Sequence, residues 1–122
     1  MPEQYFLTSN IILYCEKWEE TTDFYSNRLG LPITFSCDWF MEFRLTDTSR
    51  MSIADEKKSR IKSPQKKGIT VALQVRDIDA VRRSFSRKAL KPTQIRDHPW
   101  NAKVFYLFDP EGHRIEIWQQ NS

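Results

Sequence analysis

The sequence has no long hydrophobic run and few cysteines, and each shortage excludes a class of protein. No stretch reaches the roughly 18 apolar residues that a membrane-spanning helix needs, so we expect no membrane span. Residues 1–5 lack the basic and then apolar run of a secretory signal. Cys15 and Cys37 are the only cysteines and have no metal-binding spacing, so we interpret them as reduced thiols of a cytoplasmic protein. A disulfide between them is the alternative.

Histidine is equally scarce, with two residues in the chain. His98 falls in a polar stretch, residues 97–101, that is typical of a loop, and His113 comes directly after a turn. A histidine-based metal site needs two such residues spaced on one face of an element. We therefore interpret both as surface or turn residues rather than ligands.

What the sequence does contain is typical of one globular domain spanning residues 1–122. Of its 122 residues, 39% are hydrophobic and 29% are charged, with a net charge of +3. The charge is uneven: residues 55–67 hold six Lys or Arg against two acids, and the rest of the chain is about neutral. We interpret the polar stretch 56–67 as a solvated basic connector. This connector has no interleaved aromatic residues and no helical stripe, so nucleic-acid binding is not expected.

The connector divides the chain into two modules, at about residues 5–55 and 68–119, and these repeat each other. At an offset of 60 residues, the apolar run 11–15 matches the run 71–75, and Pro32 falls on Pro92. Both runs are short and rich in strand-forming residues. A duplicated unit explains this pattern most economically.

Each module continues from its first strand into a helix and then into further strands. Ile78, Val81, Phe85 and Ala89 recur at helical spacing, with Asp77 as the N-cap. Trp18, Thr22, Tyr25 and Leu29 form a similar stripe, and Gly30 ends it. Residues 39–45 alternate as a strand, and residues 109–112 (DPEG) predict a turn between strands 104–108 and 113–118. The predicted fold class is α+β, with two tandem βαβββ modules.

Three motifs in this order resemble a known superfamily. Residues 23–31 (DFYSNRLGL) resemble its "FY…LG" helix end, residues 75–79 resemble its second strand-to-helix entry, and residues 105–116 resemble its "DPxGxxxE" hairpin. On these motifs the chain resembles the vicinal oxygen chelate superfamily, which includes glyoxalases, bleomycin resistance proteins and extradiol dioxygenases. The resemblance implies that the sheets of the two modules form a curved mixed-sheet cup, with the helices outside and a small-molecule site inside.

Alternation along the strands separates a helix-facing set from a mixed set that would line the cup. The helix-facing set is Ile11, Leu13, Met41, Phe43, Val71, Leu73, Phe105, Leu107, Ile115 and Ile117. From the mixed set and the loop before residue 101, the candidate ligand-binding residues are Asn10, Phe40, Glu42, Arg44, Thr70, Trp100, Tyr106, Arg114, Glu116 and Trp118. Rings, charges and amides on one face suit a small-molecule cavity, although solvent or a second subunit is the alternative.

The resemblance also assigns four metal-ligand positions, which here are Asn10, Ala54, Thr70 and Glu116. Of these, Glu116 alone has a side chain that readily binds a divalent cation. We therefore expect no metal cofactor, and no enzymatic activity is favoured. The predicted function is the binding of a small aromatic or cationic molecule, because the cup offers flat rings and two acids, Glu42 and Glu116.

An alternative function is that of a divergent metal-dependent lyase, isomerase or dioxygenase, for which Glu116 is the best candidate catalytic residue. We expect Arg44 or Arg114 to pair with Glu42 and Glu116 and keep both ionised. The resemblance further implies a homodimer as the working form, with a small molecule as ligand. From the composition, no nucleic-acid or membrane partner is expected.

Overall fold

The computed structural model describes residues 7–59, 69–99 and 101–121. By its internal contacts the chain divides into two compact units, residues 1–65 and 66–122. The division falls inside the predicted basic connector, most of which lies outside the described residues. Each unit is described by itself below. No helix in the described ranges is both long and apolar enough to cross a membrane.

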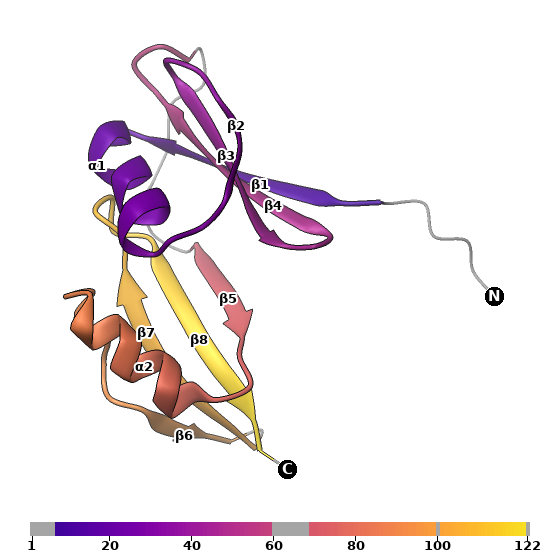
Figure 1. Cartoon of the computed structure of the whole chain (residues 1–122), viewed down its shortest axis with the longest axis vertical. Coiled ribbons are helices and arrows are strands. Elements are labelled where there is room, and N and C mark those ends of the chain that lie inside the picture. The colour runs from indigo at the N-terminus through magenta and orange to yellow at the C-terminus, as the bar shows by residue number, and fades with distance from the viewer. Residues whose placement is uncertain (1–6, 60–68, 100, 122) are drawn as a thin grey trace. The chain divides into compact units, whose positions relative to one another are not determined.

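The first unit contains one helical segment and four strands (Figure 1). Its elements are β1 (Ser9–Cys15), α1 (Trp18–Asp23), the π-helical turn η1 (Phe24–Arg28), β2 (Ile33–Ser36), β3 (Phe40–Thr46) and β4 (Ser49–Asp55). The strand order is β1-β4-β3-β2. β1 runs parallel to β4, while the other two pairs are antiparallel, so the sheet is mixed.

The second unit repeats this arrangement (Figure 1). Its elements are β5 (Thr70–Gln74), α2 (Ile78–Arg87), β6 (Arg96–His98), β7 (Ala102–Phe108) and β8 (Arg114–Gln120), with the strand order β5-β8-β7-β6. Again the first strand is parallel to the last and the others are antiparallel. The predicted βαβββ repeat is therefore confirmed. The strand β6 shows that His98 lies in a strand, so its expected loop position is wrong.

One face of each sheet is covered by its own helix and forms the core. In the first unit the ring of Tyr25 lies 6.0 Å from that of Phe43, and in the second Phe85 lies 6.1 Å from Phe105. Most of the predicted helix-facing set is buried: Leu13, Phe43, Val71, Phe105, Leu107, Ile115 and Ile117. Met41 and Leu73 are half-buried, and Ile11, near the start of β1, is the exposed member of the set at 46%.

Both helices end in left-handed residues, but the second ends earlier than its apolar stripe predicts. Gly30 has φ +82°, as expected of a C-terminal stop. After α2, Ala89 has φ +58°, and the amides of Ala89 and Leu90 bond back to the carbonyls of Ser86 and Phe85. This is a Schellman motif with alanine in the position that glycine usually occupies. Ala89 therefore lies beyond the helix, and the buried Leu90 occupies the apolar position.

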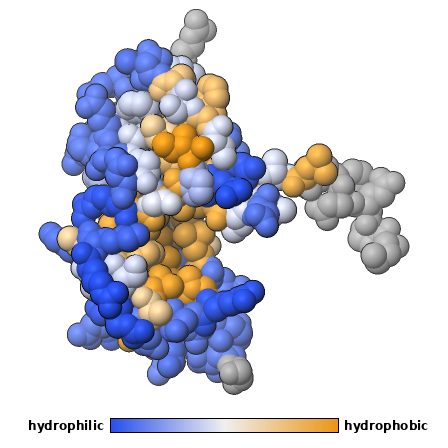
Figure 2. Space-filling view, viewed as in Figure 1, coloured by the Kyte–Doolittle hydropathy of each residue, from blue (hydrophilic) through white to orange (hydrophobic). Residues whose placement is uncertain are grey.

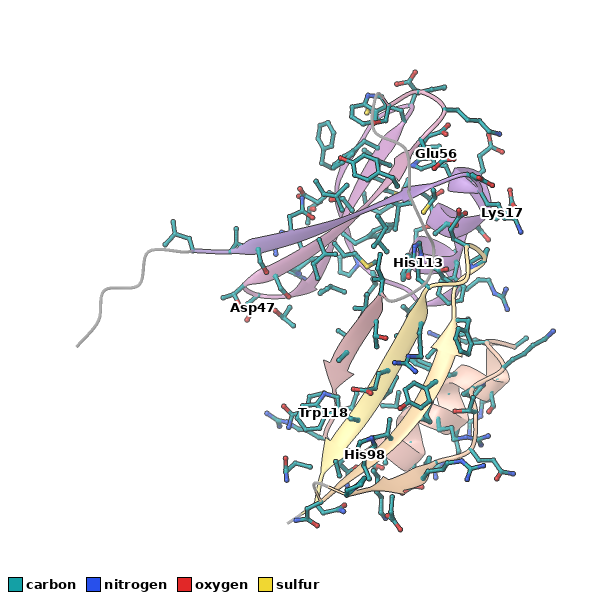
Figure 3. The ribbon with its side chains drawn as sticks, turned by 180° about the vertical axis from the view of Figure 1, so that it is seen from behind. Lys17, Asp47, Glu56, His98, His113 and Trp118 are labelled. Atoms are coloured by element: carbon teal, nitrogen blue, oxygen red, sulfur yellow. The ribbon has the colours of Figure 1, made fainter. Side chains whose placement is uncertain are left out.

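The predicted turn between β7 and β8 is present and is locked by a buried acid. The amide of Gly112 bonds to the carbonyl of Asp109, as in a type I turn. One carboxylate oxygen of Asp109 accepts from the amides of Glu111 and His113, and the other bonds to His113 Nδ1 at 2.8 Å. His113, labelled in Figure 3, is 1% exposed. His113 is a turn residue, as one of the two predictions had it. The other prediction, a surface position, is wrong, because the ring is buried against the Asp109 carboxylate.

Candidate functional site

The face of each sheet opposite its helix carries most of the predicted ligand-binding residues, and we call it the open face. Partners in the strand register share a face, so the register identifies three rows on each open face. In the first sheet these rows are Asn10-Arg50-Arg44, Ile12-Ser52-Glu42 and Tyr14-Ala54-Phe40. In the second they are Thr70-Arg114-Phe108, Ala72-Glu116-Tyr106 and Gln74-Trp118-Val104.

On the first open face a chain of hydrogen bonds orients the carboxylate of Glu42. Thr34 Oγ1 donates to Glu42 Oε1 at 2.7 Å, and Asn10 Nδ2 donates to Glu42 Oε2 at 3.3 Å. The oxygen of the Asn10 amide in turn accepts from Ser52 Oγ at 2.8 Å. The bonds thus link side chains from all four strands. Because both carboxylate oxygens accept from neutral donors, the negative charge is held in position without being neutralised.

Two aromatic side chains share the open face with this carboxylate, and a third ring contacts one of them. Phe35 pairs with Glu42 across the β2–β3 register, and its ring lies 6.3 Å from that of Phe40. The centre of the Trp39 ring lies 5.3 Å from that of Phe40. Phe35 is 55% exposed and Trp39 is 38% exposed, which leaves both rings accessible. Rings around an unneutralised carboxylate attract a flat, positively charged molecule.

The second open face holds a carboxylate and a guanidinium side by side. The Arg114 guanidinium lies over the ring of Tyr106, 4.9 Å from its centre, and its Nε donates to Thr70 Oγ1 at 3.0 Å. Glu116 lies next to both in the register and is half-buried. Trp118 follows two residues later on the same face, and Figure 3 views this sheet from the side away from α2, with Trp118 labelled.

The expected pairing of arginines with the two acids is not found within either unit. Among the described residues, Arg44 forms no ion pair with Glu42, and Arg114 forms none with Glu116. The Arg114 guanidinium instead lies over the Tyr106 ring and donates a hydrogen bond to Thr70 Oγ1. Arg44 is exposed and lies across from Arg50, another cation.

The remaining candidates are placed as follows. Asn10, Phe40 and Glu42 come together on the first open face, while Thr70, Tyr106, Arg114, Glu116 and Trp118 share the second. Trp100 lies outside the described residues. Thr34 and Phe35 were missed, although the strand-forming residues 33–36 offered a signal for β2.

The residues at the four metal-ligand positions do not fit a divalent cation. In the second sheet, Glu116 lies opposite Ala72. The residue equivalent to Ala72 in the first unit is Ile12, and Ser52 lies opposite it. The metal-ligand position assigned to Ala54 therefore belongs to Ser52. Ser52 and Asn10 are neutral and already bonded to each other, and Thr70 accepts from a guanidinium. No three His, Cys, Asp or Glu residues within the described ranges are grouped closely enough to hold a metal ion.

Comparison with known proteins agrees with this architecture. The profile of the Glyoxalase/Bleomycin resistance protein/Dioxygenase superfamily matches residues 8–117. No curated protein matches the sequence. Among solved structures, a glyoxalase/bleomycin resistance protein/dioxygenase from Nocardioides is 18% identical, with a TM-score of 0.80 over 100% of this chain and 87% of that one.

Two further solved structures have the same fold. A lactoylglutathione lyase from Agrobacterium tumefaciens is 15% identical, with a TM-score of 0.74 over 97% of this chain and 94% of that one. A glyoxalase/bleomycin resistance protein from Catenulispora acidiphila is 17% identical, with a TM-score of 0.71 over 93% and 97%. Two βαβββ units of the same strand order define a protein of this fold. The chain belongs to the glyoxalase/bleomycin resistance protein/dioxygenase superfamily.

Proposed function

We propose that this protein binds a small, planar, positively charged aromatic molecule, and that Glu42 and its neighbouring rings supply the main contacts. The supporting observation is the Glu42 carboxylate, held by Thr34 and Asn10 and left without a cationic partner in the described part of the chain. The rings of Phe35 and Phe40 provide flat surfaces on the same face, and Trp39 extends them through its contact with Phe40. A cation stacked on such rings gains electrostatic and dispersion energy together.

Binding would proceed without a metal, since the four metal-ligand positions hold donors already engaged with one another or with a guanidinium. A homodimer remains part of the proposal. Glu116, which also has no cationic partner among the described residues, is a second candidate anion on the open face of its own unit.

Fluorescence titration of the full chain with ethidium tests this proposal, with uncharged phenanthridine as the matched ligand. We expect ethidium to bind more tightly than phenanthridine. Glu42→Gln should weaken ethidium binding about fivefold to tenfold, because it removes one charge and keeps the size of the side chain. Glu20→Gln, on the exposed face of α1, is the control and should change nothing.

Two results would contradict the proposal. One is equal affinity for the charged and the neutral ligand, and the other is an equal effect of Glu42→Gln and Glu20→Gln. A calorimetric titration of chelator-treated protein with Ni²⁺, Zn²⁺, Mn²⁺ and Fe²⁺ addresses the alternative function. Stoichiometric metal binding that is lost in Glu116→Gln would favour a metal-dependent enzyme instead.

A further inference from the structure

A polar cavity lies on the helix side of the second unit, away from the open face. It has a volume of about 400 Å³ and is lined by Asp79, Arg82, Arg83, Gln94 and Ile95. The first three belong to α2, and the other two belong to the segment that leads into β6. Because α2 covers the opposite side of the sheet from Glu116 and Trp118, this cavity is separate from the proposed ligand site on the open face.

Arg82 is held in a fixed orientation at the edge of this cavity. Its Nε donates to the carbonyl of Thr93 at 2.8 Å, and its Nη2 donates to the carbonyl of Pro92 at 3.3 Å. Thr93 is itself tied to β7, since its amide and its hydroxyl bond to the backbone of Tyr106, each at 2.8 Å. A guanidinium has five N–H donors, so three remain for a ligand. Because the Arg82 side chain is already ordered, ligand binding does not carry the entropic cost of ordering it.

Arg83 supplies a second guanidinium that is available for a ligand. It is exposed, and within the described residues it has neither a hydrogen bond nor an ion pair. Asp79 lies four residues earlier on the same helix, a spacing at which acid and base can pair, yet the two are not within ion-pair distance. The cavity wall therefore holds two guanidinium groups and the Gln94 amide against one carboxylate.

The surroundings of the cavity are also positively charged. Residues 77–97 contain six Lys or Arg against three Asp. Figure 2, seen from the same side as Figure 1, shows a predominantly hydrophilic surface over α2. The electrostatic field of this excess positive charge raises the local concentration of anions and increases the rate at which they reach the cavity.

We propose that this cavity binds a small phosphate ester, with Arg82 and Arg83 holding the phosphate and Gln94 and Ile95 contacting the organic part. Guanidinium groups recognise phosphate through paired, charge-assisted hydrogen bonds. A volume of about 400 Å³ lies in the range of small-molecule sites and exceeds what a bare phosphate fills. Asp79, on the same wall, limits the charge that the cavity accepts.

The test is calorimetric titration of the full chain with ribose 5-phosphate, inorganic phosphate and ribose at constant ionic strength. We expect ribose 5-phosphate to bind more tightly than inorganic phosphate, and ribose not to bind. Arg83→Gln should weaken ribose 5-phosphate binding about tenfold, because it removes a charge from the contact. Asp79→Asn should strengthen binding severalfold, because it removes the opposing charge.

Arg87→Gln is the matched control, since Arg87 lies one turn along the same helix and does not line the cavity. It should leave the affinity unchanged. The proposal is overturned if the wild-type chain binds no ribose 5-phosphate. It is equally overturned if Arg87→Gln and Arg83→Gln weaken binding alike, because the anion would then respond only to the overall charge of the helix. Equal affinity for phosphate and ribose 5-phosphate would contradict the contact with the organic part.

Discussion

Asp109 is the residue at which we expect loss of the carboxylate to lower the free energy of unfolding of the second unit most clearly. It is 5% exposed, and its contacts with described residues include three accepted hydrogen bonds, from the amides of Glu111 and His113 and from His113 Nδ1. Asp109→Ala removes all three acceptor contacts and leaves their donors inside the turn. A hydrogen bond contributes about 1 kcal/mol, and a buried donor left unpaired costs about 1–3 kcal/mol. The expected loss in the free energy of unfolding is roughly 3–5 kcal/mol.

Asp109→Asn separates the two parts of this effect. The amide oxygen of asparagine can still accept from the two backbone amides, while its NH₂ group faces His113 Nδ1, which must then accept. Only the contact with the ring is changed, so we expect a loss of about 1–2 kcal/mol.

Urea denaturation, followed by tryptophan fluorescence and circular dichroism, measures both losses. Asp97→Ala is the control, because Asp97 is exposed in β6 of the same unit and should change the free energy of unfolding by less than about 0.5 kcal/mol. A loss below about 1 kcal/mol for Asp109→Ala, or equal losses for the two Asp109 variants, would refute the reasoning.

Two further substitutions test how the helices and the core are held. Ala89→Gly should raise the free energy of unfolding by about 0.5–1 kcal/mol, since Ala89 has φ +58° in a Schellman motif where glycine carries no steric cost; a decrease in the same urea assay would contradict this. Phe43→Ala should lower it by roughly 3–5 kcal/mol, because Phe43 is fully buried against Tyr25, while the more conservative Phe43→Leu should cost clearly less.

The fold could be predicted from the sequence because its signals are local. Alternation of apolar residues along the strands, the Asp77 cap, the stop at Gly30 and the turn at residues 109–112 each depend on a few neighbouring residues. All of them agree with the structure: the Asp77 side chain accepts from the Ala80 amide at 3.1 Å, and Gly30 has φ +82°. Repetition of these signals at a fixed offset then indicated two modules of one topology.

Predictions of where helices and strands begin and end were less reliable, again because the signals in the sequence are local. The stripe through Ala89 has helical spacing, but the chain turns into a left-handed residue there and buries Leu90 instead. His98 was expected in a loop because its neighbours are polar, yet residues 96–98 pair with β7 as an exposed edge strand. Pairing of this kind depends on a partner strand that the local sequence does not show.

The sheet face of most candidate residues could be predicted, but their contacts could not, and Thr34 and Phe35 were missed. Strand alternation alone assigned Glu42, Phe40, Tyr106 and Glu116 to the faces opposite the helices. Only the tertiary structure decided that Glu42 is held by Thr34 and Asn10, and that Arg114 lies over Tyr106 instead of pairing with an acid. A side chain's periodic position is set by the backbone of its own strand. Its partner is set by the register between strands, which joins residues as far apart as Asn10 and Glu42.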